Sequence, residues 1–124
     1  MNDCPIHVHV VSQYLPEQSA PDRNKFAFAY HVTIENRGTE PAQLISRHWI
    51  ITDSNGKRDE VRGPGVVGQQ PVIAPGHAHR YTSGSVLDTE VGTMEGSYQM
   101  TTISGTVFEA PIPPFLLAVP GAVH

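Results

Sequence analysis

Lys25-Phe-Ala-Phe-Ala-Tyr-His-Val-Thr-Ile-Glu-Asn36 is the stretch that decides the fold. Its large apolar side chains fall at every second position from Phe26 to Ile34, and smaller or polar residues occupy the positions between them. Side chains of an extended strand point alternately to opposite faces, so this pattern gathers the large apolar groups on one face. The stretch therefore predicts a long central strand with one face in the core.

Shorter segments with similar alternation lie on both sides of this strand, separated by turn residues. They predict strands at residues 5–15, 43–53, 57–62, 77–83, 96–103 and 106–112, and an apolar tail at 115–119 that docks as a last strand. Polar, proline-containing segments predict loops at 15–24 and 63–76, the second with a short extended piece at 71–74. Asn55-Gly56 predicts a tight hairpin turn, because both residues tolerate positive φ.

These strands predict an all-β domain in which two antiparallel sheets pack face to face, as in immunoglobulin and fibronectin type III sandwiches. A closed barrel is the alternative. We expect one domain over residues 1–124, since neither a repeat nor a second domain is evident. Pro111, Pro113 and Pro114 cannot donate ladder hydrogen bonds, so we expect that region at a sheet edge. In residues 43–53, strict alternation separates Leu44 from Arg47 and Trp49 on opposite faces.

Composition and charge argue against several classes of function. The formal charge is −4 with only eight lysines and arginines, which argues against a broad nucleic-acid surface. No apolar stretch approaches the roughly 20 residues that span a bilayer, and the opening Met-Asn-Asp-Cys-Pro is unlike a signal peptide. We therefore expect a cytoplasmic protein that neither inserts into a membrane nor binds nucleic acid. The single cysteine, Cys4, excludes an internal disulfide.

The glycines in Arg62-Gly-Pro-Gly-Val-Val-Gly-Gln-Gln-Pro71 match the G-x-G-x-x-G string of dinucleotide-binding folds. The following residues open no helix, so the match fails the structural context that this motif needs. A narrower hypothesis is that the loop binds a small anion or a partner. Its candidate residues are Arg62, Gly63, Gly65, Gly68 and Gln70, with Arg47 adding charge. The alternative is that these glycines only permit a tight crossover between the sheets.

Two His-x-His pairs, His7 with His9 and His77 with His79, would each share a strand face. Two imidazoles make an incomplete metal site, because zinc sites need three or four ligands. We therefore assign no metal and no cofactor. Motifs for nucleophilic, metal-dependent or nucleotide-dependent catalysis are missing, and the carboxylates are scattered, so the sequence favours a binding protein over an enzyme.

The aromatic residues in the alternating strands are interpreted as core residues. They are Phe26, Phe28, Tyr30, Trp49 and Tyr98. For Tyr98 the alternative is a corner hydrogen bond to the main chain, as tyrosines make in related sandwiches.

Several of these segments together resemble the ApaG family. They are Phe26–Tyr30, Leu44–Asp53, Asn55-Gly56, Val61–Pro71, Ala74–Gly76, Tyr81–Gly84, Gly92–Tyr98 and Ile112–Phe115. The resemblance covers nearly the whole chain and implies the same sandwich fold. One departure is His79, where family members usually have an aromatic residue, so His79 is interpreted as a partly buried strand position.

The resemblance implies an association with cobalt resistance and magnesium efflux, of the CorD type, and it supplies no catalytic residues. Our leading hypothesis is a non-enzymatic binding or adaptor domain that acts through an unidentified protein partner, using residues 62–70 and a nearby sheet edge. The second hypothesis is that the glycine-rich loop binds pyrophosphate or a nucleotide. The third, an enzyme acting on phosphorylated compounds, has the least support.

Overall fold

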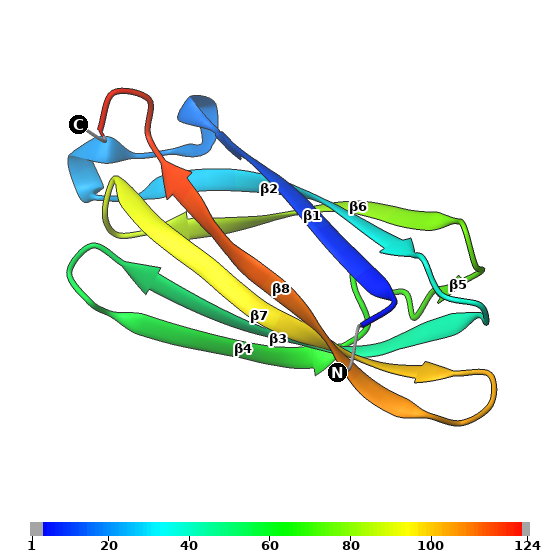
Figure 1. The fold of residues 1–124 in the computed structure, drawn as a ribbon. Coiled ribbons are helices and arrows are strands. Elements are labelled where there is room, and N and C mark those ends of the chain that lie inside the picture. Colours follow the sequence, from blue (N-terminus) through cyan, green and yellow to red (C-terminus); the bar gives the residue numbers. More distant parts are fainter. Residues whose placement is uncertain (1–3, 123–124) are drawn as a thin grey trace.

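In the computed structural model, residues 4–122 of the chain are described, and they form two packed antiparallel sheets (Figure 1). One sheet has three strands in the order β1 (Ile6–Tyr14), β2 (Phe26–Asn36) and β6 (Ala78–Leu87). The other runs β4 (Arg58–Pro64), β3 (Ala42–Asp53), β7 (Val91–Thr102) and β8 (Val107–Ala118), and the short β5 (Val72–Ile73) also pairs with β3. The predicted all-β antiparallel sandwich is confirmed. The barrel is not formed, because within residues 4–122 β4 and β6 each pair on one side only and end their sheets.

The central strand lies where its alternation predicts. β2 pairs with β1 on one side and β6 on the other, and its large apolar side chains are buried in the core. Ala27 on the opposite face is also buried, because the segment between β1 and β2 covers it. This segment is held there by two hydrogen bonds: Leu15 N–H donates to the Ala27 carbonyl oxygen, and Ala27 N–H donates to Ser19 Oγ. The covering segment, predicted as a plain loop, contains two short 3₁₀ turns, Pro16–Gln18 and Pro21–Arg23.

Several predicted strands are longer in the structure. β6 continues to Leu87, and β7 begins at Val91 rather than residue 96. Its early part was missed because Gly92 and Gly96 interrupt the apolar pattern. Both glycines are required by close approach, since a Cβ at Gly96 would lie 1.9 Å from the carbonyl oxygen of His48 and one at Gly92 would lie 2.7 Å from that of Thr52.

The last strand, β8, is continuous where a strand and a separate tail were predicted. Pro113 and Pro114 fall in the register shift opposite Met94 and Gly96, so no ladder hydrogen bond is lost there. Because β8 pairs only with β7 among residues 4–122, the prediction of a sheet-edge position for the prolines is confirmed.

The hairpin between β3 and β4 is confirmed, but its turn differs from the prediction. Only Gly56 has positive φ, at 84°, and Asn55 does not. Asp53 Oδ1 accepts hydrogen bonds from the backbone N–H groups of Asn55 and Lys57. These side-chain bonds hold the turn, which was expected to have positive φ at both Asn55 and Gly56.

A bulge in β3 changes which residues face the core. The register of β3 against β7 shifts between Leu44 and Ser46, so Ile45 is an extra residue. Leu44 (0% exposed) and Trp49 (2% exposed) therefore both point into the core, although they are five positions apart. The prediction that placed Leu44 opposite to Trp49 and Arg47 was wrong, because alternation restarts after the bulge.

The core is aromatic at its centre, as predicted. Trp49 packs against Tyr30, Phe115 and Tyr98, with ring centroids 5.3, 5.9 and 6.3 Å away. Tyr98 is fully buried, and its hydroxyl hydrogen-bonds to Tyr81 of the other sheet. This contact takes the place of the main-chain corner bond that was the alternative.

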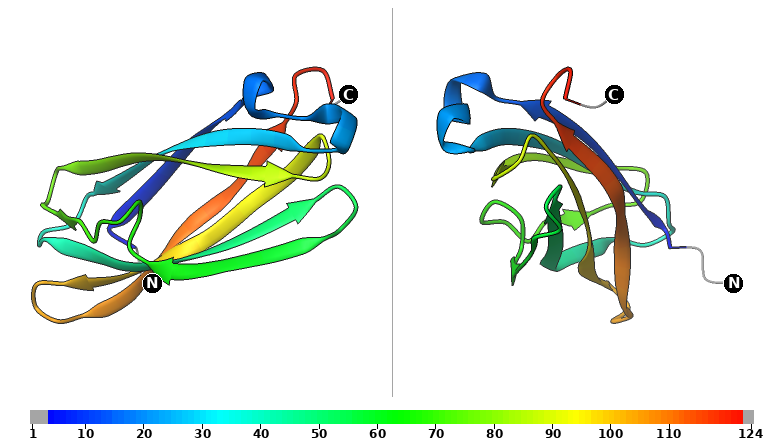
Figure 2. Two further views of the ribbon diagram at one scale, coloured as in Figure 1. Left: turned by 180° about the vertical axis from the view of Figure 1, so that it is seen from behind. Right: turned by 90° about the vertical axis from the view of Figure 1, so that its left-hand side faces the viewer.

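The two long sides of the sandwich differ. On one side β1 runs next to β8 (Figures 1 and 2). Ser12 Oγ of β1 donates a hydrogen bond to the carbonyl oxygen of Leu116 of β8 at 2.7 Å. Cys4, half-buried, lies on the same side with Sγ 3.9 Å from the carbonyl oxygen of Glu109. On the opposite side β4 and β6 leave the sandwich open. Within residues 4–122, the structure has no helix long and apolar enough to cross a bilayer.

Candidate binding cleft between strands β4 and β6

A cleft opens where the edge strands β4 and β6 face one another. Two adjoining cavities of about 460 Å³ and 240 Å³ form it, and Tyr30, Arg47 and Trp49 line both. Residues 81–85 of β6 lie along one wall, and Val61 of β4 with the loop at 64–68 lies along the other. We call this space the β4–β6 cleft. Its larger cavity is of the size that binds small molecules or side chains.

Arg47 is the charged residue at the centre of the cleft. The bulge at Ile45 turns its side chain to the inner face, in register with Gly63 of β4 and Tyr98 of β7. The guanidinium Nη1 donates to the carbonyl oxygens of Pro64 and Gly65, at 3.0 and 2.9 Å. A Cβ at Gly63 would lie 3.0 Å from both terminal guanidinium nitrogens, so glycine there gives the guanidinium room. Arg47 therefore holds the start of the loop against the sheet.

The loop itself is a tight turn. Val66 and Gln69 exchange two backbone hydrogen bonds, and the residues between them, Val67 and Gly68, have φ of 47° and 77°. Two consecutive positive φ values are the mark of a type I′ turn, and a β-branched residue such as Val67 rarely adopts one. Position 65 requires glycine, because a Cβ there would lie 2.3 Å from the carbonyl oxygen of Gln69.

The six predicted loop residues are only partly brought together. Arg47, Gly63 and Gly65 are in contact, and Gly68 lines the cleft. Gln70 is folded back, with Nε2 donating to the carbonyl oxygen of Ile45 at 2.8 Å. Arg62 pairs with His48, and it lies on the outer face of the sheet because its neighbour Val61 faces the cleft with Trp49.

Three backbone amides of the loop donate hydrogen bonds within the chain. Gly65 N–H donates to Ile45, and the amides of Val66 and Gln69 bond to each other's carbonyl groups. The amides of Val67 and Gly68 have no protein acceptor among residues 4–122. An anion held by the loop would therefore contact these two amides and would have no help from Arg62.

Tyr81 and Tyr98 add hydroxyl groups beside Arg47. Tyr81 lines the cleft and hydrogen-bonds to Tyr98 behind it. Burial raises the pKa of Tyr81 to about 12, and the nearby Arg47 charge offsets part of that effect. Burial also raises the pKa of Tyr98 far above its usual range. Both hydroxyls thus stay neutral over the physiological range.

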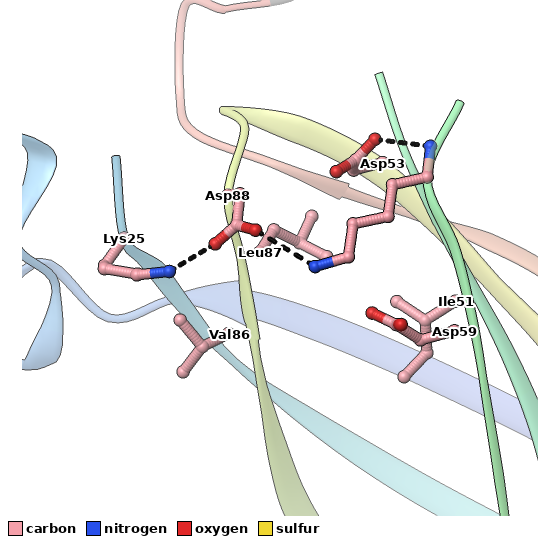
Figure 3. A pocket seen from close by; sticks show the side chains of 8 residues that line it. Lys25, Ile51, Asp53, Asp59, Val86, Leu87 and Asp88 are labelled. Carbon is pink, nitrogen blue, oxygen red and sulfur yellow. Dashed lines mark hydrogen bonds and ion pairs between the residues drawn. The ribbon is translucent and has the colours of Figure 1, made fainter. Parts of the chain in front are cut away.

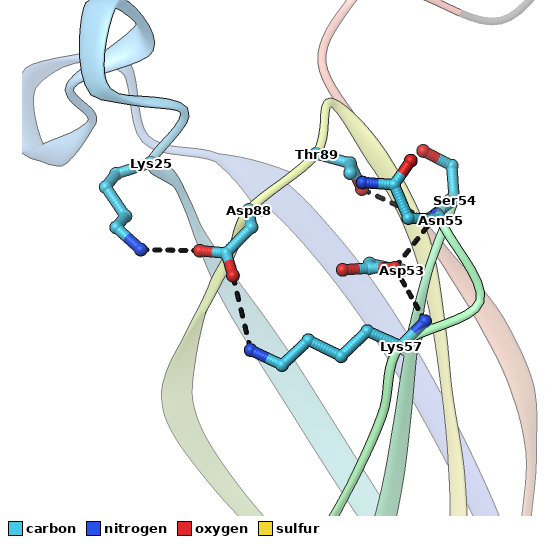
Figure 4. A network of polar contacts seen from close by, with 7 residues as sticks. All are labelled: Lys25, Asp53, Ser54, Asn55, Lys57, Asp88 and Thr89. Carbon is cyan, nitrogen blue, oxygen red and sulfur yellow. Dashed lines mark hydrogen bonds and ion pairs between the residues drawn. The ribbon is translucent and has the colours of Figure 1, made fainter.

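One end of the cleft is charged. A third cavity of about 140 Å³ continues from Ile51 to Asp88, lined also by Asp53 and Asp59 (Figure 3). Asp88 bridges the sheets there, contacting Lys25 Nζ at 2.5 Å and Lys57 Nζ at 3.3 Å (Figure 4). The hydrogen bond from Lys25, then that from Lys57, lowers the pKa of the Asp88 carboxyl. The hydrogen bond to Asp88 raises the pKa of Lys57.

The histidine pairs lie apart from the cleft centre. His7 lies on the outer face of the edge strand β1, and its Nδ1 is 3.3 Å from Arg37 Nη1. His77 precedes β6, so it does not share a strand with His79. His79 is half-buried and stacks on Tyr81 at 6.3 Å, which agrees with the predicted partly buried position. Among residues 4–122, no three His, Cys, Asp or Glu side chains are placed to hold a metal ion together.

Sequence reasoning missed most of the cleft. Tyr30 and Trp49 were assigned only to the core, and Tyr81 had no assigned role. Arg47 was a predicted candidate, and its position as an arginine within a largely apolar strand is the local signal that sets it apart from the loop residues. The facing of β4 and β6 depends on the pairing of distant strands, which no short motif encodes.

Comparison with known proteins gives consistent matches over nearly the full length. The family model described as the ApaG domain matches residues 16–102. The chain is 66% identical to Protein ApaG of Pseudomonas aeruginosa and 60% identical to that of Azotobacter vinelandii. Each match covers 119 residues, 96% of this chain and 94% of the relative.

Two crystal structures are also similar. An X-ray structure of a structural-genomics target superposes with a TM-score of 0.92 at 52% identity, covering 97% of this chain and 91% of that one. A protein described as ApaA from Bordetella pertussis gives a TM-score of 0.91 at 53% identity and 94% coverage of both chains. The fold and its whole-chain arrangement are therefore shared with these proteins.

Proposed function

The chain belongs to the ApaG domain family, and from this premise we propose that it is a non-enzymatic binding module that takes up an extended segment of a protein partner in the β4–β6 cleft. The partner's segment pairs with the free edge of β6. Its alternate side chains enter the two cavities. Main-chain hydrogen bonds supply affinity in such strand addition, and the pockets supply specificity.

The observation that carries the proposal is the pair of unpaired strand edges on one side of the sandwich, with cavities between them. An edge strand leaves alternate N–H and C=O groups without partners, which makes it a template for another strand. The opposite side offers less, because β1 and β8 lie against each other there. The loop at 64–68 borders the cleft, so this loop and the sheet edge form one surface, whereas Arg62 lies on the outer face of the sheet.

This module would influence divalent-cation homeostasis indirectly. The association with cobalt resistance and magnesium efflux that the family resemblance implies is then a property of the partner, which we expect to be a cytoplasmic protein. No cation needs to bind the domain itself. Thermal shift with Co²⁺ and Mg²⁺ tests this part, because a ligand at a hundred times its Kd stabilises a fold by about 2.7 kcal/mol.

Amide hydrogen exchange tests the strand addition. Heptapeptides selected from a random display library against the whole protein are expected to slow exchange at residues 81–85 of β6, since new hydrogen bonds protect those amides. Ser83→Trp should abolish binding, because Ser83 lines both cavities. Arg80→Trp is the matched control: it lies on the same strand, exposed and outside the cleft lining. Binders that protect only β1 or β8, or that ignore Ser83→Trp, would refute the proposal.

A second candidate function is binding of pyrophosphate or a nucleotide by the glycine-rich loop. It is favoured by the amides of Val67 and Gly68 at the mouth of the cleft, which no acceptor within residues 4–122 engages. Calorimetric titration of pyrophosphate and ATP into the wild-type protein tests it. Saturable heat in the wild-type protein supports this function, whereas no saturable heat rejects it.

A further inference from the structure

We infer that the β4–β6 cleft contains a carboxylate subsite at Arg47 and Tyr81, and that it selects partner segments in which an acidic group and an apolar side chain are two residues apart. This inference rests on the proposed function and adds the chemical identity of what is recognised. Three features support it: an uncompensated charge, a matching set of donors and an adjoining cavity with apolar lining residues.

Arg47 is a half-buried cation without an acidic partner. None of the ion pairs in residues 4–122 includes it, and the two cavities that it lines contain no carboxylate. Its protein hydrogen bonds both use Nη1, so Nε and Nη2 have no acceptor among the described residues. Half-buried charges are usually paired, and a guanidinium fits a carboxylate through two parallel hydrogen bonds. The centre of the cleft is therefore complementary to an anion.

Tyr81 supplies a further donor. Tyr81 lines the larger cavity with Arg47, and the Tyr98 hydroxyl hydrogen-bonds to the Tyr81 hydroxyl. When Tyr98 donates, the Tyr81 proton is free to point into the cleft, toward the group that Arg47 attracts. One guanidinium and one hydroxyl match a monoanionic carboxylate. Phosphate groups, which carry more charge, are typically held by clusters of arginines, and this cavity has one.

The smaller cavity favours an apolar side chain. It lies next to the larger one and shares Arg47 with it, and it adds three apolar side chains, those of Ile51, Val61 and Met94. In an extended segment, side chains two residues apart share a face and lie about 7 Å apart along the strand. A segment with an acidic residue at Arg47 can therefore place its second-next side chain among these apolar groups. The recognised pattern is acid-x-apolar, or the reverse order if the segment runs the other way.

Peptide pairs that differ by one group test the subsite. Heptapeptides selected on the whole protein are expected to be enriched in Glu or Asp two positions from Leu, Ile or Val. For a selected peptide made synthetically with an amidated C-terminus, we expect the Glu or Asp form to bind at least tenfold more tightly than its Gln or Asn counterpart. A second pair, with free or amidated C-terminus and no internal acid, distinguishes a terminal carboxylate from a side chain.

Variants of the protein locate the effect. The preference for the acidic peptide should fall to about onefold in Arg47→Met and weaken severalfold in Tyr81→Phe. Arg62→Met is the matched control and should keep the full preference, because Arg62 is a nearby arginine on the outer face of the sheet. Should Arg47→Met unfold after losing its contacts to the loop, Tyr81→Phe and the peptide pair on wild type still decide the question.

The outcomes separate the two proposals. Equal binding of acidic and amide peptides, with β6 still protected from exchange, overturns the carboxylate subsite and leaves strand addition intact. The carboxylate subsite is also overturned if Arg62→Met, and not Arg47→Met, removes the preference. A library that yields no peptide protecting residues 81–85 overturns both.

Discussion

The hydroxyl groups of Tyr81 and Tyr98 hydrogen-bond to each other across the interior, one from each sheet. Tyr98 is fully buried behind the cleft, while Tyr81 lies at its wall. Because the bond joins the two layers beside Arg47, it fixes the position of Tyr81 relative to the floor of the cleft. The contact thus links the packing of the sandwich to the proposed ligand surface.

We expect this pair to make stability fall at alkaline pH. The pKa of Tyr81 is raised to about 12 in the folded protein, and that of Tyr98 is also raised, whereas an unfolded tyrosine titrates near 10. Between about pH 10 and 12 the unfolded chain loses protons that the folded chain keeps, so the free energy of unfolding decreases as pH rises. Urea denaturation from pH 8 to 11 measures it. The double variant Tyr81→Phe with Tyr98→Phe should show a shallower decline, and an unchanged slope would contradict the assignment.

Asn36 should be among the most sensitive polar residues. Its side chain is 1% exposed, and it donates to the carbonyl oxygens of Glu40 and Ile73 and accepts from Gly38 N–H, each at 2.9 Å. Asn36→Ala leaves three groups without a partner, so we expect a loss of about 3 kcal/mol in the free energy of unfolding. Chemical denaturation measures the loss. The exposed Asn55→Ala is the control, and an equal effect of the two would refute this role.

Val67→Asn should stabilise the protein. Val67 is held at φ 47° although it is β-branched, and its side chain is 65% exposed, so little packing is lost on replacement. Asn-Gly is the preferred pair for a type I′ turn, and we expect a gain of about 1 kcal/mol. The comparison is with Val86→Asn, an exposed valine within regular strand β6, which should not stabilise. A less stable Val67→Asn protein would show that the loop needs its valine.

Lys57→Met should raise the pKa of the Asp88 carboxyl toward its ordinary value. Asp88 is held in its ionised form by Lys25 and then by Lys57, as drawn in Figure 4. Since the pKa is lowered on folding, this contribution to stability is present above the unfolded pKa near 4 and disappears as pH falls through the folded value. Carbon-detected NMR titration of the carboxyl measures the shift. Arg58→Met, on the same hairpin but paired with Glu60, should leave Asp88 unchanged.

Arg47 and Arg62 illustrate how far the sequence could predict the site. Both were candidates for the same charged loop, yet one faces the cleft and the other the outer surface. The bulge at Ile45 decides the face of Arg47, and the Ile45 carbonyl is held by Gly65 N–H and Gln70 Nε2 from the loop. These contacts join residues about twenty positions apart, so a local pattern does not reveal them.

The alternation from Phe26 to Ile34 by itself determined the central strand, and with the other period-two segments it determined an antiparallel sandwich, because side-chain direction in a strand is a local property. The tertiary structure alone decided that β8 is one strand, that Tyr81 meets Tyr98, and that β4 and β6 stay open around Arg47. Those features depend on register between strands distant in sequence, and register is set by the packing of the whole core.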